Sequence, residues 1–180
     1  QNINDGSSTE YIVSRGEYLN AVMIAAYLGY DFVDSAGLIL FDEKGKLLHD
    51  ATDAALSEEL SKHKTAVIPG FYGSEKGSTR IRTFSRGGSD ITGALVAKAI
   101  EASVYENWTD VSGFLMADPR IVDNPKPIDS ISYKELRELS YMGASVLHED
   151  AIYPARIANI PINIRNTNVP KDKGTFITAH

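Results

Sequence analysis

Cysteine is absent from this 180-residue chain. Its absence excludes disulfides, thiolate metal sites and a cysteine nucleophile, and is compatible with a reducing compartment. No apolar run approaches the ~18 residues of a membrane span, and no basic-apolar signal peptide opens the chain. The sequence therefore predicts a soluble, cytoplasmic protein that is not attached to a membrane.

Positive charge and histidine are also scarce. The 18 basic and 24 acidic side chains give a net charge of −6, so no basic surface for nucleic acid is expected. Only four histidines are present, and none has a second histidine at the i+4 spacing of a zinc helix. No metal-ligating residues are therefore predicted. The Gly-x-Ser-x-Gly elbow of serine hydrolases and the Walker pattern of P-loop proteins are missing as well.

The remaining pattern alternates helices with short apolar strands. Residues 1–9 read as a polar tail, and 10–180 as part of a single domain. Helices are predicted over 17–28, 52–63, 89–102 and 148–158, with a further one that begins with a capping box at Ser132 and Glu135. Strands are predicted over 65–68, 104–108, 160–164 and 175–177. This alternation favours an α/β three-layer αβα sandwich around a mainly parallel sheet.

The most informative segment is Thr83–Ala94, which places Arg86, two glycines, Ser89 and Asp90 directly ahead of an Ala-rich helix. Unpaired N–H groups and the macrodipole at a helix start attract an anion, and a guanidinium grips carboxylate or phosphate with two hydrogen bonds. The segment therefore indicates an anion site. A glycine turn capped by Ser89 or Asp90 explains the same string without any ligand.

A second loop, residues 109–120, follows the strand predicted over 104–108. Its Thr109 and Asp110 can bind a base, a ribose or a metal, and Arg120 can reach a phosphate. A pair of Asp-initiated turns is the structural alternative. Trp108 is expected in the strand core, because aromatic side chains favour strands.

Six motifs, taken in order, identify a family. They are Ser14-Arg15-Gly16-Glu17, Pro69-Gly70-Phe71-Tyr72-Gly73, Phe84-Ser85-Arg86-Gly87-Gly88-Ser89-Asp90, Trp108-Thr109-Asp110-Val111-Ser112-Gly113, Ala117-Asp118-Pro119-Arg120 and Gly143-Ala144-Ser145-Val146-Leu147-His148. In order and spacing they closely resemble the aspartate kinases of the amino-acid-kinase family, from Glu10 to Ile177. The resemblance implies ATP-dependent phosphorylation of the side-chain carboxylate of L-aspartate to 4-phospho-L-aspartate, at the start of lysine, threonine and methionine biosynthesis.

The resemblance also implies a role for each matched residue. Residues 10–100 would form the substrate-side portion and 101–180 the nucleotide-binding portion. Glu17 would bind the amino group of aspartate, Arg86 would hold a carboxylate, and Asp90 would organise the cationic groups around the transferring phosphoryl group. The same substrate pocket would be lined by Phe71, Gly87, Gly88 and Ser89. The nucleotide would be contacted by Thr109, Asp110, Leu115 and Arg120, with Ser145 and Val146 closing over its phosphates. Mg²⁺ would be held mainly through the phosphates, and the parent enzyme would be a homo-oligomer.

Some features depart from the family pattern. The Lys-Phe-Gly-Gly segment that opens family members has no counterpart here, and neither do the C-terminal regulatory domains. Position 145 is Ser where many members carry a phosphate-binding lysine. The chain is therefore interpreted as a catalytic-domain fragment. The alternatives are a non-catalytic nucleotide- or amino-acid-binding module, or a related kinase with another carboxylate acceptor.

Overall fold

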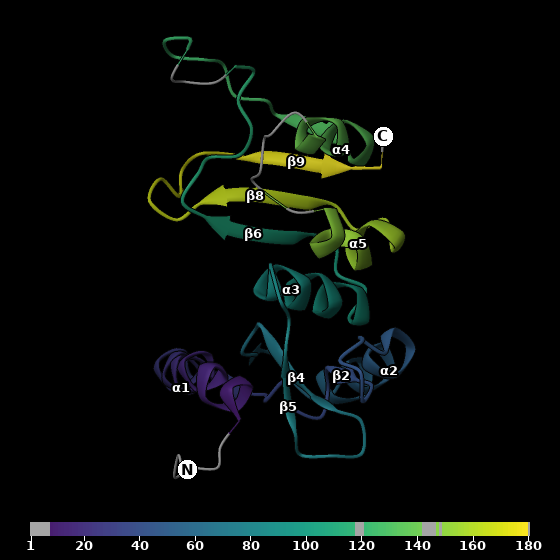
Figure 1. Ribbon diagram of the computed structural model, residues 1–180. Coiled ribbons are helices and arrows are strands. Elements are labelled where there is room, and N and C mark those ends of the chain that lie inside the picture. Colours follow the sequence, from purple (N-terminus) through teal and green to yellow (C-terminus); the bar gives the residue numbers. More distant parts are fainter. Residues whose placement is uncertain (1–7, 118–120, 142–146, 148, 180) are drawn as a thin grey trace. The chain divides into compact units, whose positions relative to one another are not determined.

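The chain folds into two compact units, Gln1–Ile100 and Glu101–His180. The computed structural model describes residues 8–117, 121–141, 147 and 149–179 (Figure 1). The interpretation of these portions as the substrate side and the nucleotide side of a single catalytic domain stays a prediction. No helix in these described ranges is both long enough and apolar enough to cross a membrane.

The first unit begins with a long helix, α1 (Thr9–Leu28). Ser8 is its N-cap, and the Ser8 hydroxyl accepts a hydrogen bond from the Tyr11 N–H at 3.2 Å. Gly29 ends the helix in the left-handed conformation (φ 68°), and its N–H donates to the carbonyl of Ala25. The predicted end at Gly29 is confirmed. The predicted start at Glu17 is two turns too late, because the helix begins at Thr9, directly after its N-cap Ser8.

Two small sheets and two further helices complete this unit. Parallel strands β1 (Asp31–Phe32) and β3 (Ala66–Val67) form one sheet. The other has the order β2-β4-β5, made of β2 (Leu40–Phe41), β4 (Tyr72–Glu75) and β5 (Ile81–Thr83). The helices are α2 (His49–Leu60) and α3 (Gly88–Ala99), which pack against each other. Figure 1 shows α1 and α2 on opposite sides of the β4–β5 hairpin.

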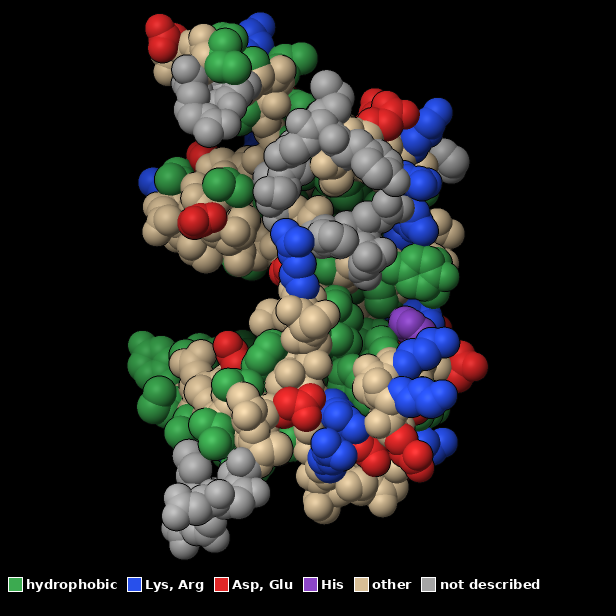
Figure 2. All heavy atoms as spheres, in the orientation of Figure 1, with side chains coloured by type: hydrophobic (Ala, Val, Ile, Leu, Met, Phe, Trp, Pro, Cys, Tyr) green, Lys and Arg blue, Asp and Glu red, His purple; other side chains and the backbone are tan. Residues whose placement is uncertain are grey.

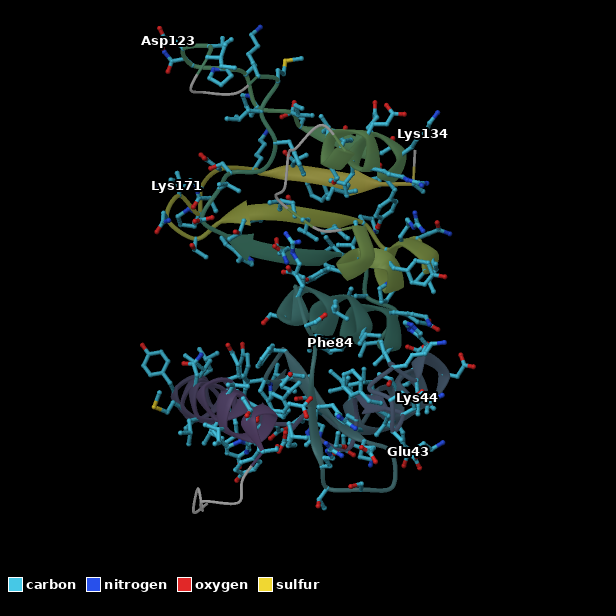
Figure 3. All side chains as sticks on the ribbon, in the orientation of Figure 1. Glu43, Lys44, Phe84, Asp123, Lys134 and Lys171 are labelled. Atoms are coloured by element: carbon cyan, nitrogen blue, oxygen red, sulfur yellow. The ribbon has the colours of Figure 1, made fainter. Side chains whose placement is uncertain are left out.

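The core of the first unit lies between these helices and strands. Its fully buried members include Ile39, Leu56 and Leu95, which come from three different elements or their ends. Phe84, labelled in Figure 3, packs against this core, with its ring centroid 5.0 Å from that of Phe41. Because Phe84 directly precedes the Arg86 loop, the core anchors one end of that loop.

The second unit holds a four-stranded sheet in the order β6-β8-β9-β7. Its strands are β6 (Tyr105–Thr109), β7 (Ser130–Ser132), β8 (Ile162–Asn166) and β9 (Thr175–Thr178). Helix α4 (Tyr133–Tyr141) packs against β7, β9 and α5 (Glu149–Ile157). The predicted capping box is confirmed: the Ser132 N–H donates to Glu135 Oε2 at 2.7 Å, and the Glu135 N–H donates to Ser132 Oγ at 3.2 Å.

The predicted α/β class with mainly parallel strands is confirmed. Among the described residues, four strand pairs are parallel and two are antiparallel. The strands are divided among three hydrogen-bonded sheets, because β1, β2 and β3 pair over only two residues each. The strands β4, β5 and β7 were not predicted.

Candidate functional site

The Arg86 loop leads from β5 into α3 with its helix start open. Gly87 is the N-cap in the left-handed conformation (φ 58°), and no side chain caps the helix. The capped turn offered as an alternative is therefore wrong, because neither Ser89 nor Asp90 acts as the N-cap. An uncapped helix start leaves its first N–H groups for a ligand, as the anion-site interpretation requires.

The turn at Phe71 packs directly on this helix start. A Cβ added at Gly88 would lie 2.9 Å from Phe71 Cα, and one added at Gly70 would lie 3.0 Å from Ser89 Cα. The Phe71 N–H donates to Thr92 Oγ1 at 3.2 Å, and the Phe84 N–H donates to the Phe71 carbonyl at 3.0 Å. The structure thus brings Phe71, Gly88 and Ser89 together, as the resemblance implied, although their role with a substrate stays a prediction.

Arg86 and Glu17 are exposed charges of opposite sign in the first unit. Within the described part of the chain, neither side chain forms a hydrogen bond or an ion pair. Glu17 lies on α1, which packs against β1, β3 and β5. Charges that the fold leaves without a partner are available to a charged ligand.

Asp90 lies in the first turn of α3, where the helix macrodipole favours a carboxylate. Its side chain is half-buried beside the loop that carries Arg86. This position is compatible with the predicted role of organising cationic groups, which stays a prediction.

In the second unit, Thr109 ends β6 and Asp110 follows it. The Thr109 hydroxyl donates to Asp110 Oδ1 at 3.3 Å, while the Thr109 carbonyl accepts from the N–H of Thr167 at 2.8 Å and from its hydroxyl at 3.0 Å. Because β6 and β8 are parallel, the loops that follow them leave the same edge of the sheet. Thr109 and Asp110 therefore occupy the edge at which α/β sheets bind ligands.

A polar network that the sequence did not indicate joins these two loops. Asn166 Nδ2 donates to Ser112 Oγ at 3.0 Å, and the Ser112 hydroxyl donates to Asp172 Oδ2 at 2.7 Å. A Cβ at Gly113, whose φ is 93°, would lie 2.7 Å from the backbone nitrogen of Thr175. The Asn-Thr-Asn triplet after a predicted strand was the available signal, but its partners lie more than 50 residues away in the chain.

Beyond Gly113, residues 114–116 pair with residues 126–128. Leu115 pairs with Pro127 in an isolated antiparallel bridge and is 40% exposed. The Met116 N–H donates to the Lys126 carbonyl at 2.9 Å. Figure 3 shows Asp123 at the tip of this loop, which projects away from the sheet of the second unit. Arg120, Ser145 and Val146 lie outside the described residues.

Trp108 corrects one expectation. Its ring is 44% exposed and is not part of the strand core, because it points to the solvated face of β6. The Arg165 guanidinium lies 4.7 Å from its ring centroid, and the Trp108 Nε1–H donates to Glu106 Oε2 at 3.1 Å. On β6, which is an edge strand of the sheet, the ring instead forms a cation–π contact with Arg165.

Among the described residues, no three His, Asp or Glu side chains gather where they could hold a metal ion. The chemistry present in each unit fits the two ligands expected from the sequence. An uncapped helix start with a free guanidinium suits an anionic amino acid, and a strand-end hydroxyl and carboxylate suit a nucleotide.

Comparisons with known proteins agree with these features. The profile of the Amino acid kinase family matches residues 2–166. Aspartokinase 3 of Bacillus subtilis is 40% identical over 177 residues, which cover 93% of this chain and 38% of that protein. The chloroplastic aspartokinase 3 of Arabidopsis thaliana is 34% identical, over 95% of this chain and 33% of its own length.

Solved structures give the same result. The aspartate kinase of Clostridium acetobutylicum superposes with a TM-score of 0.90 at 55% identity, over 97% of this chain and 39% of that one. E. coli aspartokinase III, solved with aspartate and ADP, superposes with a TM-score of 0.81 at 31% identity, over 94% of this chain and 40% of that one. The chain thus spans roughly two-fifths or less of the length of these relatives.

Proposed function

Because the chain belongs to the amino acid kinase family, we propose that it is the catalytic part of an aspartate kinase. It would transfer the γ-phosphoryl group of ATP to the side-chain carboxylate of L-aspartate. The aspartokinases at 40% and 34% identity and the aspartate kinase structure at 55% identity support this substrate. The chain's own geometry supports it independently of them.

The observation that carries the proposal is that, among the described residues, two exposed charges of opposite sign form no hydrogen bond or ion pair: Arg86, directly ahead of the uncapped start of α3, and Glu17 on α1. Aspartate bears one ammonium group and two carboxylates, so a site for it needs both signs of charge. Glu17 would bind the ammonium group, and Arg86 would hold a carboxylate through its planar fork of donors. The N–H groups of residues 87–89 and the ring of Phe71 would complete the pocket.

The chemical step needs positioning more than proton transfer. The substrate carboxylate is already ionised near neutral pH, so it attacks the γ-phosphorus without a general base. A new carboxylate O–P bond forms as the bond from the γ-phosphorus to the bridging oxygen breaks, and ADP leaves with that electron pair. Arg86, Asp90 and the α3 N–H groups would supply charge stabilisation, with each well-placed donor lowering the barrier by about 3 kcal/mol.

The second unit would supply the nucleotide contacts. Thr109 and Asp110 lie at the carboxyl end of β6, the end of a parallel strand at which α/β folds bind ligands, and Leu115 is 40% exposed. Arg120, Ser145 and Val146 are proposed as contacts on the strength of their motifs alone. Bound Mg²⁺ would neutralise phosphate charge during transfer. The homo-oligomeric state and the cytoplasmic location stay predictions.

An acceptor series tests the proposal. ADP release is followed with L-aspartate, N-acetylglutamate or no acceptor, for the 180-residue chain and for the chain extended to the length of its relatives. Turnover that depends on aspartate in the extended protein, with acyl phosphate trapped by hydroxylamine, is the expected result. Turnover with N-acetylglutamate instead would assign another acceptor. Nucleotide binding without turnover in either protein would assign a non-catalytic binding module.

A further inference from the structure

Arg15 is a buried cation held among tyrosine rings. Arg15 is only 8% exposed. Its guanidinium carbon lies 4.5 Å from the ring centroid of Tyr11 and 4.6 Å from that of Tyr18. Tyr72 supplies a third ring at 5.5 Å. The Arg15 Nη2 group donates to Ser14 Oγ at 3.0 Å. We call the three rings of Tyr11, Tyr18 and Tyr72 the arginine cage.

The third ring of the arginine cage links Arg15 to a strand end. Tyr72 is fully buried, and its hydroxyl donates to Asp34 Oδ1 at 2.7 Å. Burial, followed by the hydrogen bond to Asp34, raises the pKa of Tyr72 well above its ordinary value, so its hydroxyl remains a donor. Asp34 Oδ1 also accepts from the Ala36 N–H at 3.0 Å, which fixes the chain just after β1.

These contacts join two segments of the proposed aspartate pocket. Arg15 precedes Glu17 by two residues on α1, and Tyr72 directly follows Phe71. Phe71 has a positive φ of 78°, so its turn depends on neighbouring contacts to hold it. Arg15 and Tyr72, which are in contact at 5.5 Å, are thus each within two residues of a residue expected to bind the substrate.

We propose that Arg15 is a positioning residue for the acidic amino-acid substrate. The Tyr11 and Tyr18 rings hold its guanidinium on α1, and its contact with the Tyr72 ring holds the turn of α1 that carries Glu17 against β4, which Phe71 directly precedes. Side chains at i and i+2 of a helix do not face each other, so the caged guanidinium leaves the Glu17 carboxylate to the substrate. This inference rests on the proposed function, because it needs Glu17 to bind the substrate's ammonium group.

The chemistry of the cage requires arginine specifically. A planar guanidinium stacks on aromatic faces and donates in fixed directions, whereas the ammonium group of lysine is a compact, strongly hydrated point charge. A lysine at position 15 keeps the positive charge but loses the stacking on the tyrosine rings that fixes the position of α1. Because a displacement of about 1 Å can cost a hundredfold in rate, a shift of α1 is measurable through the substrate.

Steady-state kinetics of the extended protein test the proposal with Arg15→Lys. The KM for L-aspartate is expected to rise about tenfold, while the KM for ATP and kcat stay within about twofold. Tyr72→Phe, which keeps the ring and removes the hydroxyl, is expected to raise the aspartate KM by a smaller factor. All assays are run well below the melting midpoint of each variant.

Lys98→Gln is the matched control. It breaks the ion pair between Lys98, in the last turn of α3, and Asp53 of α2, within the same unit. This variant is expected to melt earlier with an unchanged aspartate KM. If Lys98→Gln raises the aspartate KM as much as Arg15→Lys does, the effect is one of general stability and the proposal is overturned.

A double variant tests whether Arg15 acts through Glu17. In a Glu17→Gln background, Arg15→Lys is expected to add less than twofold to the aspartate KM, since the group that it positions is already disabled. Independent, multiplying effects would overturn the proposal. An unchanged aspartate KM in Arg15→Lys, with aspartate turnover intact in the wild type, would overturn this inference alone. A wild-type protein without aspartate turnover would overturn the proposed function and the inference together.

Discussion

Among the residues that the structure describes, the exposed side chains of Arg86 and Glu17 form no hydrogen bond or ion pair. Arg82 of β5, by contrast, forms an ion pair with Glu75 of the adjacent strand β4, at 2.9 Å. A charge that the protein pairs internally supports the fold, whereas an unpaired charge beside an open helix start is available for a ligand. At the residue scale, this contrast separates the proposed substrate contacts from structural ion pairs.

Replacing Arg86 tests this distinction. Arg86→Ala in the extended protein is expected to lower kcat/KM for aspartate by about a hundredfold or more, because a hydrogen-bonded charge is lost from the site. The KM for ATP should change by less than about threefold. The exposed Arg80 on the β4–β5 turn offers a control, Arg80→Ala, with expected wild-type kinetics. Equal losses for aspartate and ATP would remove Arg86 from the substrate pocket.

Two glycines of the first unit should respond oppositely to alanine. A Cβ at Gly88 meets the Phe71 backbone at 2.9 Å, so Gly88→Ala is expected to destabilise the protein by about 1–3 kcal/mol. Nothing lies within 4 Å of a Cβ at Gly16, inside α1, so Gly16→Ala is expected to stabilise it by up to about 1 kcal/mol. Urea unfolding of both variants measures this contrast, and a destabilising Gly16→Ala would contradict it.

At the scale of elements, His63 ties the chain after α2 to strand β1. Its Nδ1 lies 2.8 Å from Asp31 Oδ2, and its Nε2 lies 3.3 Å from Glu59 Oε1. Hydrogen bonds to Asp31 and Glu59 raise the pKa of His63 above the usual 6.5. The folded state therefore favours the protonated ring, and this stabilisation is complete below pH 6.5 and is lost as the pH rises through the raised value.

Thermal melts of the wild type and His63→Gln should show this dependence. The wild type is expected to melt later at pH 6, and the difference between the two proteins should shrink as the pH is raised past neutrality. Lys64→Gln, which removes an exposed charge at the next position, serves as the control. A difference that stays constant from pH 6 to 9 would rule out a contribution from His63 protonation.

The ends of helices and strands show which features of the fold can be predicted from the sequence. The capping box at Ser132 and the glycine stop at Gly29 were predictable because each depends on contacts within one helical turn. Strand β4 was missed because its Gly73 and Ser74 are poor strand formers. Gly73 is required there because a Cβ would lie 2.7 Å from the Ile39 side chain. Such packing between distant segments is invisible in the sequence.

The candidate site shows the same limit. The sequence motifs identified Phe71 and Gly88 separately, but the backbone contact between them follows only from the fold. Asn166, which holds Ser112 from 54 residues away, carried no local signal strong enough to select it. Local chemistry was readable wherever the partners were neighbours in the chain, and tertiary pairing decided the remainder.

At the scale of the whole molecule, α1 presents a large apolar surface. Tyr27 is 86% exposed, Met23 64% and Leu19 59%. Figure 2 shows hydrophobic side chains gathered over α1 at the edge of the first unit. Monomeric proteins rarely expose such contiguous patches, so this helix face favours association in the 180-residue chain.

Light scattering coupled to size-exclusion chromatography measures that association. The 180-residue chain is expected to gain apparent mass as its concentration rises. Combining Met23→Lys with Tyr27→Lys should weaken self-association about tenfold or more, which corresponds to about 1.4 kcal/mol. Met116→Lys places a charge on a residue of the second unit that is 71% exposed, and should leave the association unchanged. A wild-type chain that is monomeric at every concentration would contradict this prediction and show that the apolar face of α1 remains exposed to water.

The positive φ of Phe71 carries a consequence for engineering. A glycine there would relax the backbone by about 1 kcal/mol or more and make the turn sturdier, yet it would delete the aromatic ring from the proposed pocket. Thermal robustness and substrate capture are therefore competing demands on a single position. A screen for heat resistance alone would be expected to select against the residue that the chemistry uses.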